Sequence, residues 1–133
     1  MASAAGHRRL AERMRHDYIN IVVCDDTEAM RVLLRHGLQG DPTLRVVAEA
    51  ADGRDGVEVV GREHPDVVVL DIAMPRLDGL SAIPHIRARS PATKILLYTA
   101  RAAPDRSGAD GYLRKGAPLA DLCAAVHQLA DAA

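Results

Sequence analysis

The sequence predicts an α/β fold built on a parallel sheet, and three observations lead to this prediction. Short apolar runs rich in β-branched residues alternate with segments whose apolar residues recur at helical spacing. The run Val-Val-Val-Leu at 67–70 contains no polar residue, as expected of a strand buried on both faces. Apolar residues make up 48% of the 133 residues, without any Phe or Trp, so aliphatic side chains must form the core. This length suits a single domain.

Strands and helices are expected to follow one another in order. The expected strands lie at 18–24, 44–51, 67–70, 94–98 and 111–114. The expected helices lie at 27–40, 53–64 and 80–89, and Pro118 opens a last one. Strands that alternate with helices pair in parallel through right-handed crossovers. The carboxyl ends of all the strands are therefore predicted to meet at one edge of the sheet.

The helices carry patterns that indicate their ends and their buried faces. The first is expected to be capped by Thr27 and to bury Met30, Leu33, Leu34 and Leu38. One side of the last helix carries Leu119, Leu122, Cys123, Val126 and Leu129. The third helix contains Pro84. Because proline fits only the first turn of a helix, this helix is expected to start late or to bend there.

Composition and charge exclude several classes of protein. The formal net charge of −1 gives no global field that would attract nucleic acid or a membrane. No apolar run approaches the ~20 residues of a membrane span, and no signal peptide is recognisable. Cys24 and Cys123 lie in apolar contexts and are expected to be buried, reduced thiols. We therefore expect a cytoplasmic protein.

Residues 1–18 differ from the rest of the chain. They are rich in Ala and Arg, and four arginines against two acids give them a local charge of +2. We expect a flexible N-terminal extension here and one folded domain at 19–133. An arm that binds nucleic acid is the alternative, and only the arginines favour it.

Polar residues follow four of the expected strands. They are Asp25 and Asp26, then Asp71, Thr99 and Lys115. Carboxylates that are brought together repel one another, and a hard divalent cation such as Mg²⁺ relieves the repulsion. A carboxylate nucleophile, a metal ion, a lysine and a hydroxyl group together make a site for phosphoryl transfer.

These residues lie in motifs that resemble the receiver domains of two-component response regulators. The matching segments are 21–26 (Ile-Val-Val-Cys-Asp-Asp), 70–79 (Leu-Asp to Asp-Gly), 98–100 (Tyr-Thr-Ala) and 108–115 (Gly-Ala-Asp-Gly-Tyr-Leu-Arg-Lys). The resemblance covers residues 19 to about 130. It implies a flavodoxin-like, five-stranded parallel sheet of order 2-1-3-4-5 with helices on both faces.

The resemblance also implies roles for individual residues. Asp71 would be the phosphoacceptor, taking its phosphoryl group from a sensor histidine kinase. Mg²⁺ would be held by Asp25, Asp26, Asp71 and the backbone carbonyl of Ala73. Thr99 and Lys115 would stabilise the phosphoryl group, and Thr99 with Tyr112 would act as the switch.

The resemblance implies partners as well. The chain would switch an output such as transcription, it could form a homodimer, and it would meet DNA only through an output domain outside this chain. No membrane partner is expected.

The chain departs from the family pattern at two places. Lys115 is followed by Gly116-Ala117, where many members have proline, and this resembles the subset with helix-turn-helix output domains. The connection at 99–110 has twelve residues, close to the minimum of about a dozen for a parallel crossover. It contains no helical stripe. We expect the helix between the fourth and fifth strands to be short or absent.

Two other functions compete with a phosphoacceptor switch that is not an enzyme in its own right. A receiver-like interaction module acting without phosphorylation would need the same fold but not the chemistry. A phosphatase of the haloacid dehalogenase class would need a second acid two residues after the nucleophile, where this chain has Ala73.

Overall fold

The protein is described by a computed structural model over residues 18–102 and 107–132, so nearly all of the expected 1–18 extension lies outside it. Five parallel strands form one sheet in the order β2-β1-β3-β4-β5, which confirms the predicted fold class. The strands are β1 (Ile19–Cys24), β2 (Leu44–Ala50), β3 (Val67–Leu70), β4 (Lys94–Thr99) and β5 (Gly111–Arg114). The helices are α2 (Glu28–Gln39), α3 (Gly53–Glu63), α4 (Gly79–Arg89) and α5 (Leu119–Asp131).

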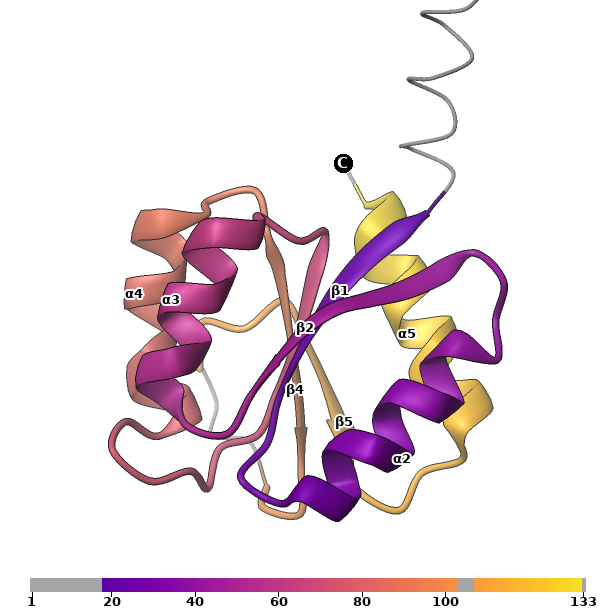
Figure 1. Cartoon of the computed structure of the whole chain (residues 1–133), viewed down its shortest axis with the longest axis horizontal. Helices are drawn as coiled ribbons and strands as arrows, with labels where there is room; N and C mark the ends of the chain where they lie inside the picture. The colour runs from indigo at the N-terminus through magenta and orange to yellow at the C-terminus, as the bar shows by residue number, and fades with distance from the viewer. Residues whose placement is uncertain (1–17, 103–106, 133) are drawn as a thin grey trace, which may run out of the picture.

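Two layers of helices cover the sheet (Figure 1). On one face α2 and α5 pack through Leu34, Leu38, Leu122 and Val126, each at most 1% exposed. On the other face α3 and α4 bury mainly Val57, Val60, Ala82, Ile83 and Ile86. The central strand β3 is buried along its whole length, as the run at 67–70 predicts. No helix of the described residues is long and apolar enough to cross a membrane.

The start and the apolar face of α2 differ in part from the prediction. Thr27 is the N-cap residue, but its side chain makes no capping hydrogen bond. Leu33 is 49% exposed instead of facing the core, whereas its neighbour Leu34 is 1% exposed. Successive residues of a helix point about 100° apart, so only one of two adjacent leucines can lie at the centre of the buried stripe. The prediction of two buried thiols is also confirmed only in part: Cys24 is buried, but Cys123 is only partly buried.

Helix α4 starts earlier than Pro84 suggests. It begins at Gly79, one residue before the expected start, and runs through Pro84 to Arg89. Asp78 fixes the start, because its side chain accepts hydrogen bonds from the backbone N–H of Ser81 at 2.9 Å and from the Ser81 hydroxyl at 3.0 Å. Pro84 is exposed, so the missing backbone bond lies on the solvent side of a helix anchored by buried residues.

We expect Asp78→Ala to destabilise the protein by about 1 kcal/mol, the usual cost of losing an N-cap side chain. The bond from the Ser81 N–H is the main cause that holds the pKa of Asp78 below its ordinary value; burial opposes it, and the bond from the Ser81 hydroxyl adds to the lowering. A lowered pKa means that this stabilisation is present at neutral pH and is lost on acidification. Urea unfolding at pH 7 and at acid pH should therefore show a difference between wild type and variant that shrinks at acid pH. Ser81→Ala is the control, because it keeps the bond from the backbone N–H to Asp78. An equal loss of stability in Asp78→Ala and Ser81→Ala would contradict the capping role of Asp78.

The connection between β4 and β5 contains no helix in its described residues, 100–102 and 107–110, in agreement with the expected short or absent helix. Residues 103–106 lie outside the description. Asp110 holds the end of the connection that leads into β5. Its Oδ2 accepts hydrogen bonds from the backbone N–H of Ile95 at 2.7 Å and from Arg87 at 2.8 Å. Arg87 extends from α4, so this helix holds the connection at the place where β5 begins.

Candidate functional site

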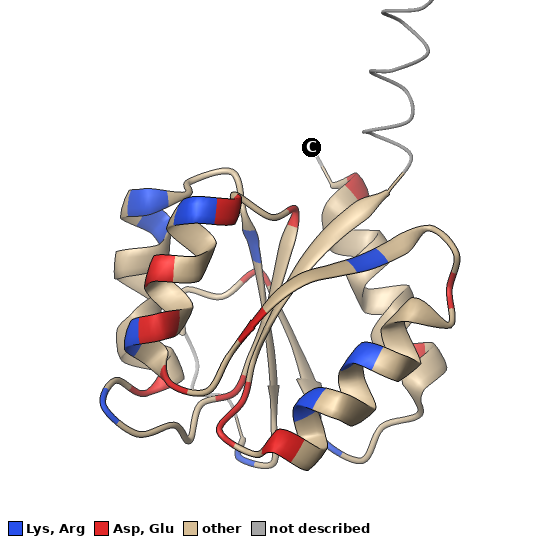
Figure 2. Ribbon diagram, viewed as in Figure 1, with Lys and Arg blue, Asp and Glu red and all other residues tan. Residues whose placement is uncertain are grey.

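Three carboxylates meet at the carboxyl edge of the sheet. Asp25 and Asp26 follow β1, and Asp71 follows β3, which pairs with β1. The backbone fixes this register, because the Asp71 N–H donates to the carbonyl oxygen of Cys24 at 3.0 Å and the Asp25 N–H to that of Ala50 at 3.0 Å. One ligand oxygen from each carboxylate lies within 4.8 Å of the others. Figure 2 shows acidic residues gathered at the end toward which the strands point.

The surroundings of the three carboxylates differ. Asp25 is 1% exposed and Asp71 is 4% exposed, whereas Asp26 lies on the surface. Hard cations prefer oxygen ligands, and Mg²⁺ usually takes one or two carboxylates and keeps several waters. Two fixed carboxylates and one facing solvent fit this requirement, so the residues present suit a Mg²⁺ ion.

Lys115 bridges the two buried carboxylates. Its Nζ lies 2.7 Å from Oδ2 of Asp25 and 2.9 Å from Oδ2 of Asp71. Burial by itself lowers the pKa of Lys115, but the hydrogen bonds to Asp25 and Asp71 outweigh burial and raise the pKa above its ordinary value. The lysine therefore stays charged and offsets part of the repulsion between the carboxylates. Its backbone N–H donates to the carbonyl oxygen of Thr99 at 2.9 Å, which ties β5 to the end of β4.

Thr99 and Tyr112 are linked through the peptide groups of Arg101. Thr99 is 1% exposed, and its hydroxyl accepts a hydrogen bond from the Arg101 N–H at 3.3 Å. The Tyr112 hydroxyl donates to the carbonyl oxygen of Arg101 at 3.1 Å. Tyr112 is 42% exposed, so its ring lies outward on β5 in this structure.

The loop after Asp71 packs tightly against the start of α4. The N–H of Gly79 donates to the carbonyl oxygen of Ile72 at 2.9 Å, and the N–H of Met74 donates to the same oxygen at 3.1 Å. A Cβ at Gly79 would overlap the carbonyl oxygen of Asp71. Only glycine allows this approach, which holds the peptide of Asp71 against the helix.

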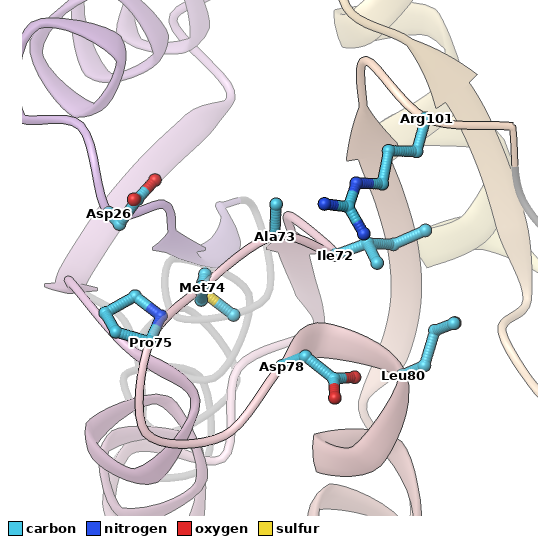
Figure 3. Close-up of a pocket in the computed structure, with 8 residues that line it drawn as sticks. All are labelled: Asp26, Ile72, Ala73, Met74, Pro75, Asp78, Leu80 and Arg101. Carbon is cyan, nitrogen blue, oxygen red and sulfur yellow. The ribbon is translucent and has the colours of Figure 1, made fainter.

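An open cavity of about 580 Å³ adjoins the acidic residues (Figure 3). Asp26 and Ala73 line it, together with Asp78, Leu80 and Arg101. In Figure 3 the Arg101 side chain reaches toward Ile72 from the connection after β4, opposite Asp26. The cavity leaves room for an incoming group beside the carboxylates.

The structure brings Asp25, Asp26, Asp71 and Lys115 together, and it adds partners that the motifs do not indicate. Arg31 donates from Nη1 to the carbonyl oxygen of Asp25 at 2.7 Å. Arg101 lines the cavity. Neither residue directly follows a strand as Asp25, Asp71 and Lys115 do, and the bond made by Arg31 depends on how the chain turns from β1 into α2.

The fold and this site define a class of protein, and comparison with known proteins identifies it. The family profile described as "Response regulator receiver domain" matches residues 21–127. The chain belongs to this family, which confirms the resemblance seen in the sequence.

Solved structures of receiver domains resemble this one closely. The signal receiver domain of the response regulator NarL from Mycobacterium tuberculosis has a TM-score of 0.82 and 29% identity, covering 88% of this chain and 99% of that one. The response regulator domain of Thermotoga maritima CheB has a TM-score of 0.80 and 25% identity, covering 87% of this chain and 98% of that one. The resemblance therefore extends over essentially the whole of these domains.

Curated relatives are longer proteins. A protein-glutamate methylesterase/protein-glutamine glutaminase from Rhodospirillum centenum is 38% identical over 117 residues, which are 82% of this chain but 30% of that protein. One from Nitratidesulfovibrio vulgaris is 49% identical over 73 residues, 55% of this chain and 20% of that protein. The chain thus spans less than a third of the relatives it matches, so their enzymatic activity does not transfer to it directly.

Proposed function

We propose that this domain is a Mg²⁺-dependent phosphoacceptor switch that receives a phosphoryl group on Asp71 from the phosphohistidine of a sensor histidine kinase. The observation that carries the proposal is the meeting of three carboxylates within 4.8 Å beside a lysine that bonds two of them. Membership of the receiver family supports it. In this proposal the site residues have the roles that the resemblance to receiver domains implies for them.

The transfer moves one phosphoryl group between two side chains. An oxygen of Asp71 attacks the phosphorus atom, the bond from phosphorus to the histidine nitrogen breaks, and an acyl phosphate forms on Asp71. Lys115 already bonds Oδ2 of Asp71, so we assign the attack to Oδ1. Bound at Asp25, Asp26, Asp71 and the carbonyl of Ala73, Mg²⁺ would offset the negative charge of the transferred oxygens. Lys115 and the Thr99 hydroxyl then pair with those oxygens.

The switch follows from the contacts of Thr99. Its hydroxyl accepts a hydrogen bond from the Arg101 N–H, and a turn of the side chain toward a phosphoryl oxygen would break this bond. Because the Tyr112 hydroxyl bonds the carbonyl of Arg101, a movement of Arg101 would also shift Tyr112. Phosphorylation would thus shift the population between two arrangements of the connection that follows β4.

The output is a further part of the proposal. Gly116-Ala117 after Lys115 resembles the subset of receivers that carry helix-turn-helix output domains, and this resemblance favours transcription as the output. The methylesterase relatives give a second candidate, in which the receiver would control a hydrolytic domain of the same protein. In either case DNA or ester substrates would be met outside this domain, in the cytoplasm where a kinase can reach it.

Incubation with acetyl phosphate and Mg²⁺, followed by intact-mass measurement, tests the chemistry. We expect wild type to gain the mass of one phosphoryl group, and Asp71→Asn and a sample treated with chelator to gain none. Because acyl phosphates hydrolyse, a beryllofluoride titration in the presence of Mg²⁺ accompanies the measurement. If wild type gains no more than Asp71→Asn and binds no beryllofluoride, the proposal fails and an interaction module that acts without phosphorylation takes its place.

A further inference from the structure

Asp25 is held by contacts to four different parts of the chain. Its N–H donates to the carbonyl oxygen of Ala50 on β2 at 3.0 Å, and its Oδ1 accepts from the N–H of Thr27 at 2.9 Å. Its Oδ2 lies 2.7 Å from Lys115. The remaining polar atom, its carbonyl oxygen, accepts from the guanidinium group of Arg31 at 2.7 Å. This last contact comes from a side chain of α2 that reaches back past the start of its own helix.

The carbonyl oxygen of Asp25 belongs to the peptide group that leads into Asp26. Because a peptide group is planar, fixing its carbonyl oxygen also fixes the direction of the Asp26 N–H. Asp26 lies on the surface, so packing restrains its side chain little. The same plane contains the Asp26 Cα, so the orientation of this peptide sets the point from which the Asp26 carboxylate extends.

Arg31 is itself braced from β2. Its Nε lies 3.6 Å from Oε1 of Glu49, and the side chains of Arg31 and Glu49 are 19% and 23% exposed. Arg35 also pairs with Glu49, through its other carboxylate oxygen. Unlike Arg31, Arg35 donates to Glu49 and not to Asp25. Glu49 precedes Ala50, so adjacent residues of β2 hold the N–H of Asp25 directly and its carbonyl oxygen through Arg31.

We propose that Arg31, braced by Glu49, is a positioning residue for Mg²⁺ binding, acting through the Asp25–Asp26 peptide to aim the Asp26 carboxylate at Asp71. This inference rests on the proposed Mg²⁺ site. It gives Arg31 a part in the reaction although the side chain touches no reacting atom.

Charge and geometry predict opposite effects when Arg31 is removed. A positive charge near a dication site repels the dication, so on charge alone an Arg31→Ala variant would bind Mg²⁺ more tightly. If Arg31 positions Asp26, the same variant binds Mg²⁺ more weakly, and changes in the groups that orient metal ligands commonly lower affinity by about tenfold or more. Arg35→Ala is a matched control, since it removes the same charge from the same helix and the same Glu49 partner.

Calorimetric titration with Mg²⁺ alone tests the inference, and urea unfolding confirms that each variant is folded. We expect Arg31→Ala to weaken Mg²⁺ binding about tenfold, Arg31→Lys to recover most of the affinity, and Arg35→Ala to bind as tightly as wild type or more tightly. Should Arg31→Ala not fold, Arg31→Met replaces it with the same expectation. The inference would be overturned if Arg31→Ala (or Arg31→Met) bound Mg²⁺ as tightly as wild type or more tightly. It would also be overturned if Arg35→Ala lost as much Mg²⁺ affinity as the Arg31 variant. A wild type that binds no Mg²⁺ would instead overturn the proposed metal site, and this inference with it.

Discussion

Lys115→Met is expected to destabilise the protein by about 3 kcal/mol, because it leaves two buried carboxylates facing each other without their shared cation. The side chains of Asp25 and Asp71 are 1% and 5% exposed, so water can replace little of what the ammonium group supplies. Methionine keeps most of the length of the lysine and removes only its charge and hydrogen bonds. Urea unfolding in the absence of divalent cations measures the loss.

Mg²⁺ should restore much of this stability. With the lysine gone, a dication is the remaining group that can offset both carboxylates, and ligand binding to the folded state raises its stability by mass action. Arg114→Met removes one positive charge from the exposed residue directly before Lys115 and should change stability by no more than about 0.5 kcal/mol. A Lys115→Met protein as stable as the Arg114→Met control would contradict the bridging role of Lys115.

Gly79→Ala is expected to destabilise the protein by about 3 kcal/mol and to impair phosphoryl acceptance as well. The added methyl group would overlap the carbonyl oxygen of Asp71, so the loop after β3 and the start of α4 must move apart. This movement displaces the proposed phosphoacceptor itself. Urea unfolding and the acetyl phosphate assay measure the two effects.

Gly40→Ala is the matched control. Gly40 ends α2 in a right-handed helical conformation at φ −65°, and a Cβ there would have its nearest neighbour at 3.3 Å. Alanine should therefore be tolerated, with a change in stability below about 1 kcal/mol. Equal stabilities for the two alanine variants would show that the close approach at Gly79 does not constrain the site.

The sheet and the residues that follow its strands could be predicted because each depends on a local pattern. The apolar run at 67–70 indicates a buried strand by itself, and the parallel order then brings Asp25, Asp26 and Asp71 to one edge. The short connection after Thr99 was also evident, because its length and loop-forming residues leave little room for a helix.

The features that could not be predicted depend on exact directions in space. Leu33 and Leu34 both fit a helical stripe, and the tilt of α2 against the sheet decides which one is buried. Pro84 argues against a helix start at Gly79, but the cap at Asp78 outweighs it. The bond from Arg31 to the Asp25 carbonyl depends on the path of the turn between β1 and α2, which no residue pattern specifies.

The identity of the phosphorylated residue tests the account most directly. Borohydride reduces an acyl phosphate of aspartate to homoserine, which peptide mass spectrometry locates in the sequence. After incubation with acetyl phosphate and Mg²⁺, we predict homoserine at position 71 and nowhere else. Homoserine at position 25 or 26, or its absence in protein shown to bind Mg²⁺ and to be folded, would contradict the assignment of Asp71 as the phosphoacceptor.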